Sequence, residues 1–216
     1  MDTKAIENRY NTLATDTCCL SCGGAIQYAE AKEGEVCLDL GSGRGTDVLR
    51  LSKTVGKNGY VYGIDISEKM VHNAKKTAQK TGAENVEFIR AELDNIPVPN
   101  DSVDLIISNC TINHAPNKQK VWNEIFRVLK EGGRFAISDI YAMDAVPEKY
   151  RNDPQAVAEC WAGAEIKESY INTIIQSGFS GFKIVEESEP YEKGKIEVAS
   201  FTIIGYKQSV SCCGCK

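Results

Sequence analysis

The sequence lacks a long apolar run and an excess of basic residues. No segment approaches the roughly 18 apolar residues of a membrane span. The opening stretch, MDTKAIENRYN, carries charges where a signal peptide needs an apolar core. Lysine and arginine number 25 against 30 acidic residues, a net charge of −5, with no basic patch or polybasic run. These absences argue against nucleic-acid and membrane partners, and they predict a cytoplasmic protein that acts on small molecules.

Cysteine is too scarce for a disulfide scaffold, but it is unevenly distributed. Nine cysteines in 216 residues, about 4%, fall below the roughly 8–10% of such scaffolds, so in a reducing compartment they should be thiols. An N-terminal cluster contains Cys18, Cys19 and Cys22, and a C-terminal cluster contains Cys212, Cys213 and Cys215. The three single cysteines are Cys37, Cys110 and Cys160. The clusters and the single residues therefore need separate explanations.

Strand-like and helix-like segments alternate from about residue 35, which is typical of a single α/β domain with a parallel sheet. The short connection between the last two strands predicts that the final strand is antiparallel. Apolar spacings of three, four and seven predict helices around 48–55, 71–78 and 121–128, and a further helix over 167–176. Gly82 and the pair Gly132-Gly133 are interpreted as helix stops. The predicted strands are 35–40, 60–65, 86–90, 103–109, 134–140, 182–187 and 199–206.

A glycine-rich stretch, LDLGSGRGTD (38–47), joins the first predicted strand to the first helix. Such a turn lets backbone approach a ligand closely at the carboxyl edge of the sheet, where doubly wound folds bind nucleotides. The glycines run G-x-G-x-G and Thr46 takes the sixth position, which departs from the dinucleotide fingerprint. The lysine of a phosphate-binding Walker loop is also absent from this stretch.

Acidic residues lie near the ends of the first three predicted strands, within the first two and just after the third. Asp39 would add negative charge beside a pyrophosphate, so it suits a cationic ligand better. Asp65 lies about 20 residues after Gly45, where a carboxylate can bind a ribose diol. Glu92 is placed for an adenine amino group. A ligand with adenine, ribose and a positive centre but no phosphate is S-adenosylmethionine.

These motifs resemble the Rossmann-like class I methyltransferases over about residues 35–206. The matching stretches are VCLDLGSGRG, YGIDIS, AELDNIPVPNDSVDLIISN and RVLKEGGRFAISD. The resemblance implies a seven-stranded, mostly parallel sheet with an antiparallel last strand and helices on both faces. It further implies that the cofactor's methionine moiety lies beside Asp39, the glycine turn and Asn109, its ribose beside Asp65, and its adenine beside Glu92 and Leu93. The implied cofactor-binding set is Asp39, Gly41, Ser42, Gly43, Gly45, Asp65, Ile66, Met70, Glu92, Leu93 and Asn109.

Two single cysteines fall where the methyl acceptor should bind. Cys110 follows the fourth strand, beside the donor methyl group, and Cys160 lies in an irregular region (141–164) expected to fold over the same opening. A soft, thiophilic atom is the natural partner of converging thiolates. Trivalent arsenic binds three sulfurs and keeps a lone pair that can attack a methyl group. No general base is then required, which agrees with the lack of a histidine–carboxylate arrangement.

The cysteine contexts resemble the arsenite S-adenosylmethionine methyltransferase family. The matching stretches are SNCTIN (108–113), ECWAGA (159–164), VPEKYR and the terminal SCCGC. The resemblance implies an enzyme that methylates trivalent arsenic held by Cys110, Cys160 and one of Cys18, Cys19 or Cys22. It also implies a thiol reductant such as thioredoxin or glutathione, which reopens a transient disulfide of an upstream cysteine. Which upstream thiol plays which part stays open.

This reading divides the chain into three parts. Residues 1–34 form an N-terminal cysteine-containing segment or lid, and residues 35–207 form the methyltransferase domain, in which 141–164 are a substrate cap. Residues 208–216 form a cysteine-rich tail. Tyr10 in the first part either closes over the cofactor or simply packs; Trp161 and Tyr141 either wall the substrate pocket or pack the cap.

Two other functions remain open. The first is a methyltransferase for a small organic acceptor, such as a quinone or a sterol-like carbon, in which Cys110 is incidental. The second is a non-catalytic thiol protein that binds a metalloid or zinc, for instance through Cys19 and Cys22 with two tail cysteines. Cys37 alternates with core residues and is interpreted as structural. His72 is interpreted as a surface residue, and His114 as loop filler where the arsenic family usually has an apolar residue.

Overall fold

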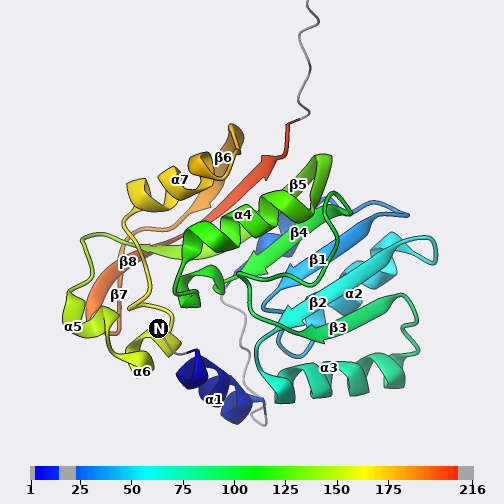
Figure 1. Cartoon of the computed structure of the whole chain (residues 1–216), viewed down its shortest axis with the longest axis horizontal. Coiled ribbons are helices and arrows are strands. Elements are labelled where there is room, and N and C mark those ends of the chain that lie inside the picture. Colours follow the sequence, from blue (N-terminus) through cyan, green and yellow to red (C-terminus); the bar gives the residue numbers. More distant parts are fainter. Residues whose placement is uncertain (1–2, 15–22, 209–216) are drawn as a thin grey trace, which may run out of the picture.

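The computed structural model describes residues 3–14 and 23–208. A central sheet has the strand order β3-β2-β1-β4-β5-β8-β6, with β7 paired to β8 (Figure 1). The first five strands are parallel, and β8 is antiparallel to both β5 and β6. The predicted Rossmann-like architecture is confirmed. The strands are β1 (Val36–Leu40), β2 (Tyr60–Asp65), β3 (Val86–Arg90), β4 (Val103–Asn109), β5 (Leu129–Ala142), β6 (Gly181–Glu187), β7 (Tyr191–Lys193) and β8 (Ile196–Tyr206).

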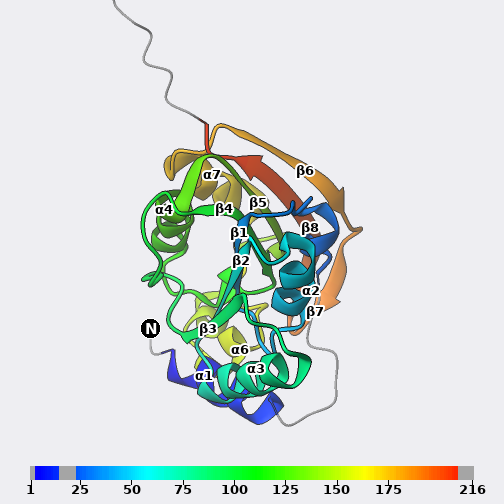
Figure 2. The ribbon, with the colours of Figure 1, turned by 90° about the vertical axis from the view of Figure 1, so that its right-hand side faces the viewer.

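Helices cover both faces of the sheet, as the apolar spacings predict. Figure 2 shows α4 and α2 on opposite sides of the strands. The helix α7 packs against α4, whereas α3 shares the side of α2 with the short 3₁₀ helix η1. The helices of these two layers are α2 (Thr46–Val55), α3 (Glu68–Thr81), α4 (Lys118–Val128) and α7 (Lys167–Gln176), with η1 at Ala25–Tyr28. No helix in residues 3–14 and 23–208 is long and apolar enough to cross a membrane.

Alternation along the buried strands builds two cores. Leu38 and Leu40 of β1 face the α4 side, where Trp122 makes edge-to-face contacts with Phe135 and other rings. Such aromatic pairs add roughly 0.5–1.5 kcal/mol beyond their buried area. Cys37 faces the α2 side, and burial raises the pKa of its thiol to about 12. This placement agrees with the structural interpretation of Cys37, because a buried thiol with a raised pKa is unreactive.

Two local predictions need correction. The strand expected at 134–140 begins at Leu129, directly after α4, so Gly132 and Gly133 lie inside β5 and do not stop the helix. A Cβ on Gly133 would lie 2.9 Å from the carbonyl oxygen of Lys130, so the pair serves a tight bend in the strand. The sheet also has one strand more than the seven predicted. This additional strand, β7, lies in the connection that was expected to be a loop. By contrast, Gly82 ends α3 in the left-handed conformation, as predicted.

The carboxyl edge of the sheet carries three further helices. The region 141–164, expected to be irregular, contains the end of β5 and the short helices α5 (Glu148–Arg151) and α6 (Pro154–Ala158). The N-terminal helix α1 (Lys4–Leu13) packs against α6 and α3 (Figure 1). A third apolar cluster joins these helices to the ends of β5 and β8, and it contains Ile6, Cys160 and Trp161.

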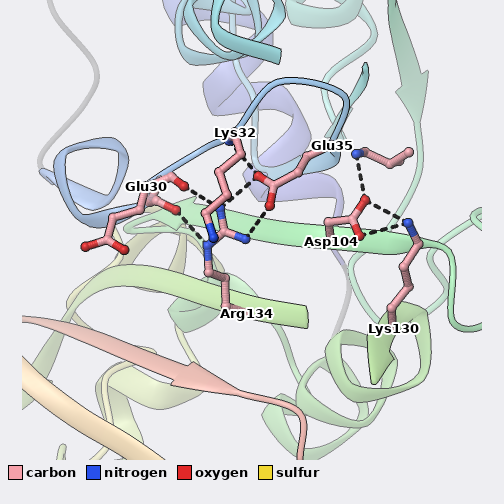
Figure 3. Close-up of polar contacts among 8 residues, drawn as sticks. Glu30, Lys32, Glu35, Asp104, Lys130 and Arg134 are labelled. Atoms are coloured by element: carbon pink, nitrogen blue, oxygen red, sulfur yellow. Dashed lines mark hydrogen bonds and ion pairs between the residues drawn. The ribbon is translucent and has the colours of Figure 1, made fainter. Parts of the chain in front are cut away.

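A clamp of charged groups closes the opposite, amino edge (Figure 3). The Arg134 guanidinium donates to both carboxylate oxygens of Glu35 at 2.7 and 2.8 Å, and to the carbonyl oxygens of Ala29 and Glu30 at 3.0 and 2.6 Å. The Arg134 and Glu35 side chains are only 12% and 15% exposed. The clamp therefore fixes the segment that connects η1 to β1.

Replacing Arg134 with methionine should destabilise the fold by about 3 kcal/mol, because it removes the paired cation of a largely buried carboxylate and the guanidinium hydrogen bonds to two carbonyls. The matched control is Lys130→Met, since the Lys130–Asp104 pair in the same region is more exposed and should contribute less than about 1 kcal/mol. Urea unfolding of both variants measures the difference. Equal losses in the two variants would contradict the assignment of the clamp.

Candidate active site at the carboxyl edge

The turn between β1 and α2 forms the floor of the site. The amides of Gly41 and Ser42 donate to the carbonyl oxygen of Ile64 at 2.8 and 2.9 Å, which ties the turn to β2. Gly41 has φ of 76°, and a Cβ there would lie 2.1 Å from the Thr111 hydroxyl oxygen. Gly43 has φ of 51° with open space where its Cβ would be. The turn is thus packed on the side of the Cys110 loop and open at Gly43, where a ligand can approach the backbone.

Three carboxylates, those of Asp39, Asp47 and Asp65, surround this turn. Asp39 and Asp65 are buried at the ends of β1 and β2, and Asp65 accepts hydrogen bonds from the amides of Gly43 (2.9 Å) and Ser67 (2.8 Å). Burial, and then repulsion from Asp47 and Asp65, holds the pKa of Asp39 well above its usual value. Burial likewise raises the pKa of Asp65, against the two amide hydrogen bonds. A cationic ligand would relieve this repulsion, whereas a phosphate would increase it.

Glu92, one of the two predicted adenine residues, lines a cleft beside β3. Ile66 and Glu92 contribute to a cleft of about 210 Å³ whose other wall is formed by Thr3 and Glu7 of the N-terminal segment. The Thr3 hydroxyl donates to Glu92 at 3.0 Å. Of the remaining members of the predicted set, Leu93 is half-buried after β3, whereas Met70 is fully buried in the first turn of α3.

Asn109 connects the glycine turn to the returning N-terminal segment. Its amide nitrogen donates to Asp47 at 3.3 Å, and its amide oxygen accepts from the Ala25 backbone at 3.2 Å. Gly23 packs closely here, since a Cβ on it would lie 2.4 Å from the Asn109 side-chain oxygen and 2.6 Å from Ser138. The chain therefore passes the carboxyl edge at Gly23, directly beside the residue that precedes Cys110, before it reaches the amino edge, where β1 begins.

The structure brings Cys110 and Cys160 together. The Cys160 thiol lies 3.4 Å from the carbonyl oxygen of Cys110 and donates to it, and the Cys110 amide donates to the Ser138 carbonyl at 2.8 Å. Both cysteines have left-handed backbones, with φ of 51° and 77°. This conformation costs energy for a residue with a side chain and concentrates at functional sites. The predicted proximity is confirmed, and the ligand role of the two thiols stays a prediction.

The predictions for Cys18, Cys19 and Cys22 lie outside the described residues, as do those for Cys212, Cys213 and Cys215. In residues 3–14 and 23–208, no group of three His, Cys, Asp or Glu side chains has an arrangement that could hold a metal ion. Of the predicted arsenic ligands, the described residues include Cys110 and Cys160, and a three-thiol site stays a prediction.

The N-terminal helix α1 lies over the carboxyl ends of β2 and β3. The Asn11 side-chain oxygen accepts from the Ser67 hydroxyl at 2.7 Å, and Glu7 pairs with Arg90 at 2.7 Å. The Asn73 side chain donates to the carbonyl oxygen of Ala14 at 3.1 Å. These contacts attach the helix to α3 and to the ends of β2 and β3.

His114 has contacts that the sequence did not predict. The imidazole is 6% exposed and hydrogen-bonds both the Tyr10 hydroxyl (2.9 Å) and the Val157 carbonyl (3.0 Å), so it is not loop filler. Its place four residues after Cys110 was the available signal, but no local pattern indicates that Tyr10 lies beside it. His72, in contrast, is exposed as predicted.

The two aromatic residues left open in the cap pack against neighbouring elements. Trp161 is buried against Tyr150, with ring centroids 5.2 Å apart. Tyr141 contacts the Phe201 ring and donates its hydroxyl to Glu187 at 2.6 Å. These contacts favour a packing role for both side chains.

Comparison with known proteins agrees with this geometry. The family described as "Methyltransferase domain" matches residues 31–189. The arsenite methyltransferase of Halobacterium salinarum is 38% identical over 173 residues, covering 80% of this chain and 44% of that protein. The human arsenite methyltransferase is 41% identical over 136 residues, covering 59% of this chain and 36% of that protein. The crystal structure of an arsenic(III) S-adenosylmethionine methyltransferase from Chlamydomonas reinhardtii superposes with a TM-score of 0.74 at 28% identity, covering 95% of this chain and 74% of that one.

The fold and the glycine turn define a Rossmann-like methyltransferase. The chain belongs to the methyltransferase domain family, and its relatives support S-adenosylmethionine as the cofactor. The chain spans less than half the length of these two arsenite methyltransferases.

Proposed function

We propose that this protein transfers a methyl group from S-adenosylmethionine to trivalent arsenic held by cysteine thiolates. The observation that carries the proposal is the junction of Cys110 and Cys160, two left-handed cysteines joined by a 3.4 Å contact next to Asn109. Two soft ligands at the methyl-donor edge suit a thiophilic acceptor. The names of the similar proteins point to the same substrate.

The described residues fit the cofactor. S-adenosylmethionine supplies an electrophilic methyl group on a cationic sulfonium. Asp39 would stabilise this positive charge, Asp65 would accept hydrogen bonds from the ribose, and the open backbone at Gly43 would lie against the methionine moiety. Ile66, Glu92 and the Leu93 amide would contact the adenine in the cleft beneath α1.

The acceptor site needs a third thiol from the N-terminal cluster. One of Cys18, Cys19 and Cys22 would supply this thiol. The other two cysteines then remain for a transient disulfide, which a thiol reductant such as thioredoxin or glutathione would reopen.

The residues around the thiols are suited to positioning the acceptor. Arsenic bound by three sulfurs carries a lone pair and no proton, so methylation requires no base at this site. His114 agrees with this assignment, since burial lowers its pKa to about 4 and both ring nitrogens are already hydrogen-bonded. Correct placement of reacting groups can contribute roughly 7–11 kcal/mol in favourable cases.

The flanking segments have distinct proposed roles. Residues 1–34 would act as the lid and supply the third thiol, residues 141–164 would form the substrate cap within the methyltransferase domain (35–207), and residues 208–216 would be a separate thiol tail. Lys207, which precedes the tail, pairs with Gly132 and Gly133 at the amino edge. The tail thus starts from the edge opposite Cys110.

The direct test incubates the purified full chain with arsenite, S-adenosylmethionine labelled in its methyl group, and a thiol reductant. We expect labelled methylarsenicals, with one demethylated cofactor formed for each methyl group transferred. Parallel reactions without arsenite, and with a quinone or a sterol in its place, are the controls. Methyl transfer to an organic acceptor but not to arsenite would show the alternative methyltransferase function. Arsenite or zinc binding without consumption of the cofactor would show a non-catalytic thiol protein.

A further inference from the structure

His114 lies at the junction of three segments that meet at the candidate site. It belongs to the loop that begins at Cys110, and it contacts the cap through Val157 and the N-terminal helix through Tyr10. The Tyr10 and His114 rings also meet edge to face, with centroids 5.4 Å apart. The side chain is 6% exposed, so these contacts are shielded from water.

The hydrogen-bond partners fix the state of the imidazole. The Val157 carbonyl can only accept, so the hydrogen lies on Nδ1, and Nε2 of the neutral ring must accept from the Tyr10 hydroxyl. The charged groups that act on His114 are Lys118, Arg9 and Lys193, and each disfavours a second proton. Burial raises the pKa of Tyr10, so its hydroxyl remains a donor. The two bonds of His114 therefore have fixed directions at neutral pH.

One carbonyl couples the two cysteine turns. The Val157 oxygen accepts from His114 Nδ1 at 3.0 Å and also from the backbone amide of Cys160 at 2.9 Å. On the other side, the Cys160 thiol donates to the Cys110 carbonyl. The loop 110–114 therefore contacts the cap at its first residue, Cys110, and at its last residue, His114. The His114 imidazole also hydrogen-bonds Tyr10 of α1.

We propose that His114 is a positioning residue with two roles. Its Nδ1 hydrogen bond fixes the Cys110 turn relative to the Cys160 turn, and its Nε2 hydrogen bond holds the N-terminal helix over the proposed cofactor site. This inference rests on the proposed function for its biological meaning, because it concerns the placement of the arsenic ligands. The geometric coupling itself can be measured without arsenic.

Two amide variants, each of which replaces one ring nitrogen, separate the two hydrogen bonds of His114. In His114→Asn, the side-chain amide can still reach Val157, where Nδ1 lay, but not Tyr10. In His114→Gln, the longer amide can reach Tyr10, where Nε2 lay, but not Val157. His114→Leu removes both bonds, and Tyr10→Phe removes only the bond to α1. Circular dichroism melting of each variant establishes that the chain is folded.

Two readouts test the assignment. The first is the rate at which a short bifunctional thiol cross-linker joins Cys110 to Cys160, in a full chain whose N-terminal and tail cysteines are serine. The second is the dissociation constant of S-adenosylmethionine, measured by calorimetry. We expect His114→Gln to slow cross-linking about fivefold with unchanged cofactor affinity, the size of one net hydrogen bond. We expect His114→Asn and Tyr10→Phe to weaken cofactor binding by a similar factor at an unchanged cross-linking rate.

The outcomes are distinguishable from failure of the proposed function. Neither readout contains arsenite, so an enzyme that methylates another acceptor would still show the split. His114→Leu should lose both properties. Parallel losses in the Asn and Gln variants would indicate a merely structural role and overturn the proposal, as would cross-linking and affinity that stay at wild-type values in all four variants.

Discussion

Replacing Cys110 with serine is expected to lower arsenite-dependent methyl transfer by about 100-fold or more. A hydroxyl is a poor ligand for a soft metalloid, so the acceptor would lose one of its three bonds and its fixed position. A misplacement of only about 1 Å can cost roughly 100-fold in rate. Cys160→Ser should behave alike, since the two cysteines meet at the 3.4 Å contact. Initial rates with labelled S-adenosylmethionine provide the measurement.

The matched control is Cys37→Ala. Cys37 is fully buried in β1, faces the α2 layer, and has a thiol whose pKa is raised to about 12. Its replacement should reduce stability by about 1–2 kcal/mol through lost packing and leave the rate per folded molecule within about twofold. Equal activity of wild-type protein and Cys110→Ser would remove arsenic ligation from the account and favour an organic acceptor.

The second prediction with a large effect concerns charge recognition by Asp39. Asp39→Asn should weaken binding of S-adenosylmethionine by about tenfold, ~1.4 kcal/mol, while changing the affinity for the demethylated product much less. The two ligands differ in the sulfonium charge, which Asp39 faces in the proposed complex. Asparagine has nearly the shape of the carboxyl group but cannot ionise. Calorimetric titration of each ligand into both proteins measures the effect.

The pH dependence has a definite sign. Burial raises the pKa of Asp39, so the ligand-free site favours the neutral carboxyl, whereas a cationic ligand favours the ionised form. Affinity for S-adenosylmethionine should therefore rise with pH through this raised pKa and level off above it. The rise should be absent in Asp39→Asn. A pH slope that is the same for the sulfonium and the demethylated product would contradict the assignment.

Much of this fold follows from local patterns in the sequence. Leu38, Asp39 and Leu40 alternate between the two faces of one strand, and the glycine turn follows directly, so the carboxyl edge could be located without coordinates. The bend at Gly132 and Gly133 could not, because a glycine pair after a helix is usually a stop. Here it lies in a strand, because the backbone of Lys207, just beyond β8, hydrogen-bonds to both glycines from a distant part of the chain.

The candidate site was only partly predictable for the same reason. The contexts of Cys110 and Cys160 predicted that the two thiols act together, although they are 50 residues apart in sequence, and the structure places the Cys160 thiol against the Cys110 carbonyl. His114 was misjudged, because its partners lie in segments that no local pattern connects to it. The positive φ values of both cysteines are likewise invisible in the sequence, since glycine or asparagine normally marks such positions.

The most direct test of the central claim is X-ray absorption at the arsenic edge of the full chain loaded with equimolar arsenite. The three tail cysteines are replaced by serine so that they cannot compete for the metalloid. We predict three sulfur neighbours in this protein, and two after Cys110→Ser or Cys160→Ser. An arsenic environment that is unchanged by both substitutions would contradict the claim that these thiols hold the methyl acceptor.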